Sequence, residues 1–181
     1  TEATRDKNMV VLAGLPLTVN GVLYNVAAVL HDGDILGFVP KSYLPTYSEF
    51  YEGRHYHSGA DIEADVLFNG RTYPFGTRLL FRCRQMPAFT LGIEICEYLW
   101  VAQPPSISHA LAGATVIANL SASDETTGKD IYRRSLVSGQ SARLVCGYIY
   151  ADAGEGESST DLVFGAHNLI CENGSILAES E

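Results

Sequence analysis

Short apolar runs separated by turn residues dominate the chain, and this pattern predicts a protein rich in β-strands. Asp32-Gly33, Asn69-Gly70 and Asn173-Gly174 are residue pairs that favour tight hairpin turns. We expect strands over Met9–Leu15, Val22–Leu30, Ile35–Val39, Leu67–Tyr73, Arg78–Arg84, Phe89–Cys96, Ala114–Leu120, Val145–Tyr150, Leu162–Phe164, His167–Glu172 and Ser175–Ala178.

Two segments carry the signals of a helix instead. Apolar residues recur at approximately helical spacing in Lys129–Leu144. Ser106–Ala112 opens with a serine, which favours the N-cap position. Many strands with few helices indicate an α/β protein with at least one mixed sheet. Irregular loops are expected over the aromatic-rich Pro40–Gly59 and the Gly- and Ser-rich Asp152–Asp161.

The chain is acidic, and its charge narrows the classes of partner. Its 181 residues suit one domain, and 21 acidic against 12 basic residues give a net charge of −9. Such a charge argues against nucleic acid or an anionic membrane as the main partner. No apolar stretch reaches the roughly 18 residues that span a bilayer, and no signal peptide is evident.

The cysteines and histidines indicate neither a disulfide framework nor a metal site. Four cysteines occur without a CxxC pair, which is typical of reduced, cytoplasmic proteins. The histidines are scattered, so no metal is expected. Because the chain begins without a methionine and stops just after a strand-like segment, we interpret it as a piece of a longer polypeptide.

Cys96 is the candidate nucleophile. It ends the apolar run from Phe89, and polarity changes sharply after it, so a strand would hold the thiol and a turn would follow it. Strand alternation places Cys96 on the same face as Glu94. A buried structural cysteine is the alternative interpretation.

Lys41 is the candidate cation beside that thiol. It follows an apolar run, and an ammonium can lower a thiol pKa or stabilise an oxyanion. A surface lysine in a loop is the alternative. Nearby carboxylates could serve as a general base, and periodicity does not choose among them. They are Glu49, Glu52, Glu94 and Glu97.

Several segments together resemble the nitrilase, or carbon–nitrogen hydrolase, superfamily. Within it they are similar to the glutamine amidohydrolase domains of glutamine-dependent NAD synthetases. The similarity runs across nearly the whole chain, and the set of motifs is specific. The segments are Pro40–Arg54, Gly92–Trp100, Ile117–Ser123, Tyr132–Arg134 and Gly154–Phe164.

The resemblance implies an αββα sandwich with a Glu-Lys-Cys triad. Cys96 would attack the glutamine side-chain amide, and Lys41 would steady the tetrahedral intermediate. The backbone N–H of Glu97 would share that oxyanion role. Glu52, eleven residues after Lys41, matches the family's second glutamate, which orients the lysine.

The same resemblance implies the ligands and partners. Tyr47, Ser123 and Lys129 fall where this branch places glutamine-binding groups, although relatives can carry arginine at the last position. The glutaminase domain needs no cofactor, whereas ATP and Mg²⁺ belong to a synthetase domain that this chain lacks. We expect that domain in the same parent chain, and homo-oligomers.

Two departures from the family pattern follow. No residue from Thr1 to Leu36 matches the family's general-base glutamate, so we expect a partial domain, a sandwich incomplete at its N-terminus, with little or no glutaminase activity in isolation. Tyr98 stands where the branch usually has aspartate, and a phenol does not supply that charge.

Two other functions compete with a glutaminase domain. One is a stand-alone nitrilase-type amidase that acts on another small amide. The other is a non-catalytic assembly module, in which Cys96 and Lys41 are packing residues. Product analysis with glutamine distinguishes the stand-alone amidase from a glutaminase domain. Labelling with a glutamine-mimicking electrophile distinguishes the assembly module from a glutaminase domain.

Overall fold

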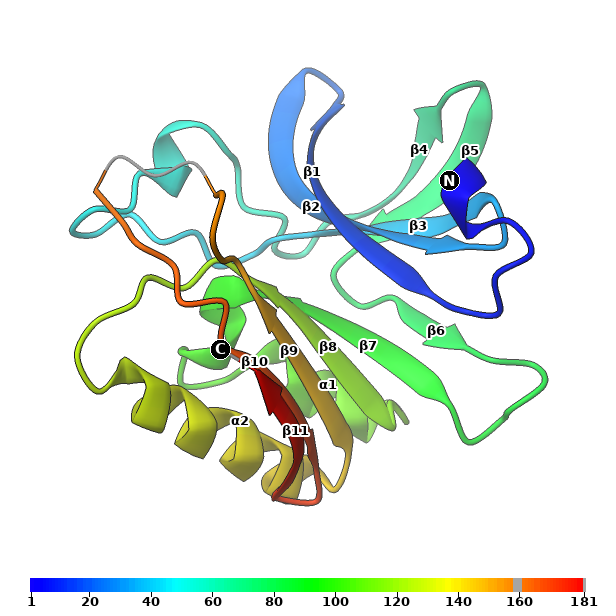
Figure 1. Ribbon diagram of the computed structural model, residues 1–181. Coiled ribbons are helices and arrows are strands. Elements are labelled where there is room, and N and C mark those ends of the chain that lie inside the picture. Colours follow the sequence, from blue (N-terminus) through cyan, green and yellow to red (C-terminus); the bar gives the residue numbers. More distant parts are fainter. Residues whose placement is uncertain (158–160, 181) are drawn as a thin grey trace. The chain divides into compact units, whose positions relative to one another are not determined.

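The chain divides into two compact units, residues 1–79 and 80–181, and each is built around one sheet. The computed structural model describes residues 1–157 and 161–180 (Figure 1). Part of the expected Asp152–Asp161 loop, residues 158–160, therefore lies outside the described residues.

The first unit contains a five-stranded sheet in the order β1-β2-β3-β5-β4. The first three strands form an antiparallel meander, β5 pairs in parallel with β3, and β4 pairs antiparallel with β5. The elements are the 3₁₀ turn η1 (Glu2–Thr4), β1 (Val11–Val19), β2 (Val22–His31), β3 (Asp34–Pro40), the 3₁₀ turn η2 (Glu52–Arg54), β4 (Glu63–Phe68) and β5 (Arg71–Gly76).

Tight turns fix the register of these strands. Asp32 and Gly33 have φ angles of 46° and 81°, and Asn69 and Gly70 have 50° and 76°. Two successive positive φ values match the twist of the flanking strands, which explains why Asp-Gly and Asn-Gly pairs mark hairpins. All three turns expected from the sequence are confirmed, since Asn173-Gly174 joins the last two strands.

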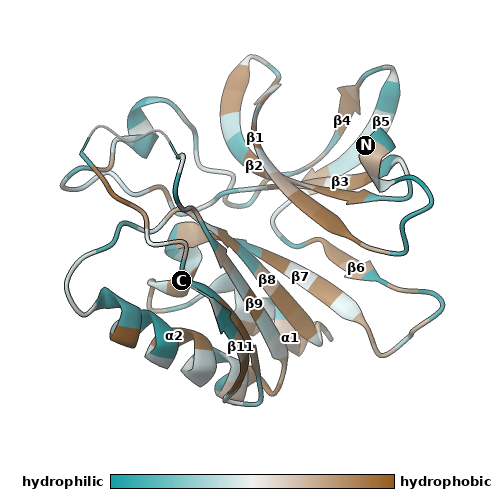
Figure 2. Ribbon diagram, viewed as in Figure 1, coloured by the Kyte–Doolittle hydropathy of each residue, from teal (hydrophilic) through white to brown (hydrophobic). Residues whose placement is uncertain are grey.

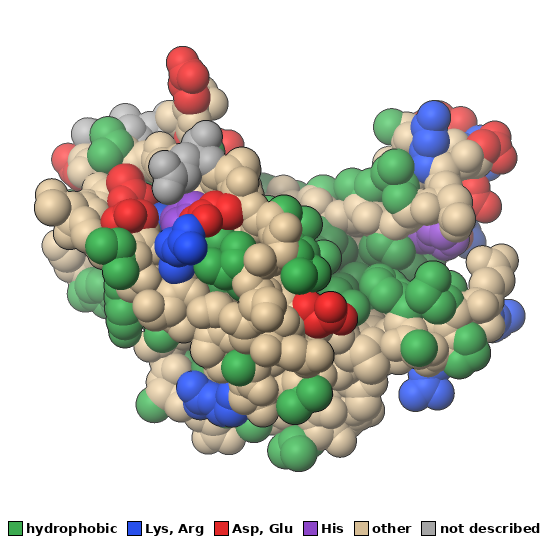
Figure 3. All heavy atoms as spheres, turned by 60° about the horizontal axis from the view of Figure 1, so that its bottom comes forward, with side chains coloured by type: hydrophobic (Ala, Val, Ile, Leu, Met, Phe, Trp, Pro, Cys, Tyr) green, Lys and Arg blue, Asp and Glu red, His purple; other side chains and the backbone are tan. Residues whose placement is uncertain are grey.

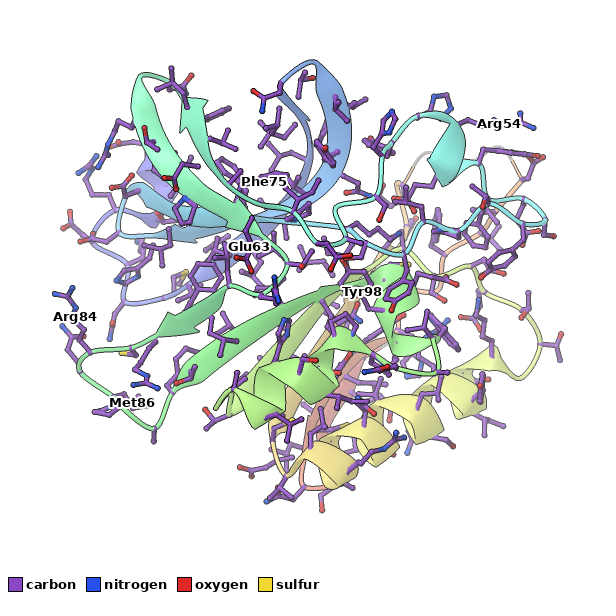
Figure 4. The ribbon with its side chains drawn as sticks, turned by 180° about the vertical axis from the view of Figure 1, so that it is seen from behind. Arg54, Glu63, Phe75, Arg84, Met86 and Tyr98 are labelled. Carbon is purple, nitrogen blue, oxygen red and sulfur yellow. The ribbon has the colours of Figure 1, made fainter. Side chains whose placement is uncertain are left out.

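Side chains of alternate strand positions form the core of the first unit. Phe38 lies edge-on to Phe68 and Tyr73, with ring centroids 5.5 Å and 6.0 Å away. Alternate positions of β2, such as Tyr24, Val26 and Ala28, share this cluster because successive side chains of a strand point to opposite faces of the sheet. The buried members are Leu17, Tyr24, Val26, Ala28, Phe38, Val66, Tyr73 and Phe75, the last labelled in Figure 4.

The second unit contains a six-stranded mixed sheet in the order β11-β10-β9-β8-β7-β6. The neighbours β7, β8 and β9 are parallel, and the outer strands are antiparallel to their neighbours. The elements are β6 (Leu80–Arg82), β7 (Thr90–Ile95), the 3₁₀ turn η3 (Cys96–Leu99), α1 (Pro105–Leu111), β8 (Val116–Ser121), α2 (Lys129–Leu144), β9 (Gly147–Asp152), β10 (Asn168–Glu172) and β11 (Ser175–Ser180).

Helices cover one face of this sheet. The helix α2 packs against β9, β10 and β11, and α1 packs against β7. Figure 2 shows hydrophobic colours along much of the strands and strongly hydrophilic stretches on α2. The buried cluster between them contains Leu99, Ala114, Ile117, Val137, Cys146, Tyr148, Tyr150, Leu169 and Cys171.

The expected helix over Lys129–Leu144 is confirmed at both ends. The expected N-cap at Ser106 is wrong, because Pro104 occupies that position and Pro105 opens the helix. Proline suits the first helical position, since it lacks the N–H that has no partner there. Ser106 instead donates its N–H to the carboxylate of Glu94.

Two strand predictions are also wrong. The expected strand Leu67–Tyr73 spans a turn, because Asn69-Gly70 lies inside that range and joins β4 to β5. Leu162–Phe164 forms no strand, and of it only Phe164 makes an isolated bridge, to Asp124. The first strand is displaced from Met9–Leu15 to Val11–Val19, where it pairs with β2 along its whole length.

No helix in the described parts of the chain is both long enough and apolar enough to cross a bilayer. On the face drawn in Figure 3, acidic and basic side chains gather in small groups separated by uncharged surface. Some charged side chains form exposed ion pairs. Two examples are Arg71–Asp34 and Arg78–Glu63, with nitrogen–oxygen distances of 2.9 Å and 2.7 Å.

Glycine at position 92 allows β7 to pack closely under α1. A Cβ there would lie 2.9 Å from Nδ1 of His109 and 3.0 Å from Cδ1 of Ile117. We expect Gly92→Ala to lower the free energy of unfolding by about 1–3 kcal/mol, the usual cost of overpacking. The matched control is Gly139→Ala in α2, where a Cβ meets nothing within 4 Å.

This control should raise the free energy of unfolding by about 0.5–1 kcal/mol, because alanine is the better helix former. Urea unfolding of the two variants measures both effects. Equal stability of the two variants would contradict the packing of β7 described above.

Candidate active site

Cys96 lies at a sharp turn at the carboxyl end of β7. All six residues of that strand are buried, and Cys96 follows them with a φ of 47°. The 3₁₀ turn η3 begins at the same residue, so the chain changes direction at the thiol. A positive φ is uncommon for a residue other than glycine. The predicted position of Cys96, at the mouth of a buried strand, agrees with this geometry.

A chain of hydrogen bonds runs beneath Cys96. Its backbone N–H donates to Oδ1 of Asn119, 3.0 Å away. Nδ2 of Asn119 donates to the hydroxyl of Tyr148 at 3.2 Å, and that hydroxyl donates to Oε2 of Glu94 at 2.5 Å. The N–H of Ser106 donates to the other oxygen of Glu94 at 2.6 Å. We call Glu94, Tyr148 and Asn119 the buried relay.

The environment of Glu94 makes it an acceptor inside the protein. Its side chain is fully buried, and burial raises its pKa, while the hydrogen bonds from Tyr148 and Ser106 oppose that rise. Both carboxylate oxygens have donors. The sequence left four carboxylates as candidate general bases. Of these, Glu94 is held by hydrogen bonds inside the second unit.

The raised pKa of Glu94 has a consequence for stability. Between the ordinary pKa and the raised one, the folded state holds more protons than the unfolded state, so stability falls as pH rises through that window. We expect Glu94→Gln to make this fall shallower, because the amide does not ionise. Burial also raises the pKa of Asp152, so part of the slope remains. Urea unfolding at acidic to neutral pH measures it, and identical slopes in the two proteins would contradict it.

Lys41 forms a buried ion pair within the first unit. It follows β3, and its Nζ donates to Oε2 of Glu52 at 2.5 Å. The two side chains are 4% and 14% exposed, which distinguishes this pair from the surface pairs. Nδ2 of Asn25 donates to the second oxygen of Glu52 at 2.5 Å. Lys41 is thus no freely solvated surface lysine.

The loop between Pro40 and Gly59 is tied back to the sheet by its own backbone. The N–H of Lys41 donates to Asn25 O at 2.8 Å, and the N–H of Gly59 donates to Lys41 O at 2.8 Å. Glu52 opens η2, and its N–H donates to Pro45 O at 3.2 Å. These bonds bring Glu52 to Lys41 across eleven positions, a pairing that hydrophobic periodicity does not indicate.

The other predicted site residues have different environments. Ser123 is buried, and its N–H donates to Oδ1 of Asp152 at 2.8 Å. The ammonium of Lys129 contacts the carboxylate of Asp124 and lies 5.2 Å from the centroid of the Trp100 ring. Ser123 and Lys129 thus flank Asp124 at one end of the second sheet.

Tyr47 belongs to the first unit and is 57% exposed. Its ring lies 5.7 Å from that of Phe50, centroid to centroid, in an edge-on arrangement. Glu97 stands in the first turn of η3, directly after Cys96, and Glu49 is half-buried in the Pro40–Gly59 loop. Tyr98, labelled in Figure 4, lies on η3 and is 1% exposed, so its ring is buried beside the turn that carries the Cys96 thiol.

Arg133 is a buried cation that no sequence pattern marks as a site residue. Its guanidinium donates to Oε2 of Glu125 at 3.0 Å, lies 2.9 Å from Nδ1 of His167 and 3.8 Å from Oδ2 of Asp152. Asp152 in turn accepts from Ser123, so Arg133 supports the segment that carries Ser123. Its place on the helix face of Val137 and Ser141 is the signal that indicates burial.

The four thiols differ in access. Cys146 and Cys171 are buried, and burial raises the pKa of Cys146 to about 11 and that of Cys171 above its ordinary value. Cys83 and Cys96 are half-buried. Because the thiolate is the nucleophile, Cys146 and Cys171 are unsuited to covalent chemistry. Within residues 1–157 and 161–180, no group of three His, Cys, Asp or Glu side chains could hold a metal ion.

No protein-family model matches the chain. Among curated proteins, the glutamine-dependent NAD(+) synthetase of Mycobacterium tuberculosis is 50% identical over 172 residues, which are 95% of this chain and 25% of that protein. The synthetase of Mycobacterium leprae is 46% identical over 179 residues. The chain spans about a quarter of the length of the curated relatives it matches.

Solved structures resemble the fold. A glutamine-dependent NAD(+) synthetase from Cytophaga hutchinsonii superposes with a TM-score of 0.82 at 29% identity, over 95% of this chain and 27% of that one. A member of branch 10 of the nitrilase superfamily from Saccharomyces cerevisiae gives a TM-score of 0.71 at 14% identity, over 98% and 57%. The expected nitrilase-like α/β fold is confirmed.

Proposed function

We propose that this chain forms part of a domain that hydrolyses the side-chain amide of glutamine. The chain has the nitrilase-superfamily fold and is homologous to one region of the glutamine-dependent NAD(+) synthetases. The ammonia released would supply NAD synthesis from deamido-NAD. The observation that carries the proposal is the position of Cys96, at a turn with a positive φ directly after a buried strand. This residue stands in a chain of which 95% aligns with a synthetase at 50% identity.

The proposed mechanism is a two-step acyl transfer. A general base takes the proton of Cys96, and the thiolate attacks the amide carbon of glutamine. The tetrahedral intermediate collapses as its nitrogen is protonated, so the carbon–nitrogen bond breaks and ammonia leaves. Water then attacks the glutamyl thioester, which releases glutamate and returns the thiol.

Two groups would stabilise the oxyanion of that intermediate. The Lys41 ammonium is one, and its buried pairing with Glu52 supports a fixed position rather than a mobile side chain. The backbone N–H of Glu97 is the other, and its place in the first turn after Cys96 supports that assignment. Preorganised donors lower the barrier because they need no rearrangement during the reaction.

We assign the recognition of glutamine to Tyr47, Ser123 and Lys129. The side chain of Lys129 is 21% exposed, and its ammonium is suited to the α-carboxylate of an amino acid. The carboxylate of Asp124, which already contacts that ammonium, would face the α-ammonium of the same ligand. No cofactor takes part in this half-reaction, and ATP and Mg²⁺ would act in a synthetase domain of the same parent chain.

Product analysis tests this function. In a chimera, this chain replaces the matching 172 residues of the Mycobacterium tuberculosis relative. We expect glutamine with a ¹⁵N-labelled amide to yield glutamate and labelled ammonia in equal amounts. Turnover of other small amides but not of glutamine would favour the stand-alone amidase. No turnover of any amide by a folded chimera would favour the assembly module.

A further inference from the structure

The buried relay joins three residues that no sequence motif connects. Glu94 lies on β7, Asn119 on β8 and Tyr148 on β9, and all three are at most 1% exposed. In the register of the sheet, Glu94 faces Asn119 across β7 and β8, and Tyr148 pairs with Ile117 two positions earlier on β8. Their side chains therefore share the face covered by the helices.

The hydrogen bonds of the relay start from β7 and return to the residue that follows this strand. Glu94 lies on β7 two positions before Cys96, and the bonds return to the backbone N–H of Cys96 through Tyr148 and Asn119. Each polar group inside the relay has a partner, as buried polar groups require. The second oxygen of Glu94 is held by the N–H of Ser106 at the start of α1.

The last bond of the relay acts on the strained residue. Cys96 has a φ of 47°, a conformation that costs energy for a side chain with a Cβ. Its N–H donates to Oδ1 of Asn119, so the peptide plane before the thiol is fixed. The directions of the Cys96 side chain and of the next peptide group follow from that plane.

We propose that Asn119 is a positioning residue for the Cys96 nucleophile, held in its working orientation by Tyr148 and Glu94. This inference rests on the proposed function, because it concerns the same thiol. Asn119 touches no reacting atom in this account. It acts through the backbone of Cys96, and small misplacements of a nucleophile have large effects on rate.

The test compares two reagents on Cys96 of the full chain. A diazo-ketone analogue of glutamine requires a thiol aimed at a bound ligand, whereas iodoacetamide requires only an accessible thiolate. For Asn119→Leu we expect labelling by the analogue to slow by about 10-fold or more, with alkylation by iodoacetamide little changed. Asn119→Asp keeps an acceptor for the Cys96 N–H and should retain most of the labelling rate.

Two controls separate positioning from stability. Ser141→Ala removes a buried hydroxyl that donates to Cys146 O at 2.7 Å, at the far end of α2 from Arg133, and should leave both labelling rates unchanged. Tyr148→Phe should slow labelling by the analogue but not alkylation by iodoacetamide, because Asn119 loses the hydroxyl to which its Nδ2 donates. If the Asn119 variants unfold, amide hydrogen exchange at Cys96 tests the positioning role in the wild-type chain and in Tyr148→Phe. We expect slow exchange of the Cys96 amide in the wild-type chain and faster exchange in Tyr148→Phe.

The outcomes distinguish this inference from the proposed function. If the analogue labels Cys96 neither in the wild-type chain nor in the folded chimera, the proposed function fails. If the analogue labels the wild-type chain and Asn119→Leu at equal rates, the positioning role is overturned while the proposed function stands. The same holds if labelling by the analogue is slowed equally in Asn119→Leu and in Asn119→Asp. Unprotected exchange of the Cys96 amide in the wild-type chain also overturns it.

Discussion

Cys96→Ala is expected to reduce glutamine-dependent NAD synthesis by the chimera by about 10³-fold or more, because no other side chain of the site would form the thioester. Synthesis supported by added ammonium salt should persist, since ammonia replaces the product of the lost step. The measurement is the rate of NAD formation with each nitrogen source in turn.

The matched control for this prediction is Cys83→Ala. Cys83 is the other half-buried thiol of the second unit, and its N–H donates to Phe89 O at 3.0 Å. This variant should keep both rates. Loss of the ammonium-dependent rate in Cys96→Ala would indicate a folding defect, and an unchanged glutamine-dependent rate would contradict the assignment of the nucleophile.

Glu52→Gln is expected to lower the free energy of unfolding by about 3 kcal/mol, because it leaves a buried ammonium without its counter-charge. The Lys41 side chain is 4% exposed, so water does little to replace the lost carboxylate. Urea unfolding measures the loss. The same variant should also slow labelling of Cys96 by the glutamine analogue if Lys41 is the oxyanion donor.

Two further variants check the cause of that loss. Glu63→Gln breaks a pair with Arg78 whose side chains are 61% and 69% exposed, and should cost less than about 1 kcal/mol. The double variant Lys41→Met with Glu52→Gln removes both charges and should recover part of the stability lost in Glu52→Gln. Equal losses in Glu52→Gln and Glu63→Gln would contradict the buried pair.

Local patterns in the sequence predicted the parts of the fold that local physics decides. The helix over Lys129–Leu144 follows from apolar spacing, and the Asp32-Gly33 turn follows from backbone conformations that few residues adopt. Cys96 was predictable as a strand end because polarity changes there. The predicted cap at Ser106 was wrong because two prolines before it decide where α1 begins.

The relay beneath Cys96 was beyond sequence reasoning. Tyr148 and Glu94 are 54 positions apart, and only the order and register of the parallel strands bring them together. The choice of Glu52 as the partner of Lys41 came from the family resemblance rather than from any periodicity. Its contact depends on how the Pro40–Gly59 loop folds back on the sheet.

The central claim is that Cys96 is a nucleophile aimed at a glutamine-like ligand, and peptide mapping after treatment with the diazo-ketone analogue tests it most directly. We expect a stoichiometric adduct on Cys96, prevented by excess glutamine and lost in Cys96→Ala, with Cys83, Cys146 and Cys171 unmodified. An adduct on another cysteine, or labelling of Cys96 that glutamine does not prevent, in the chain or in the folded chimera, would contradict it.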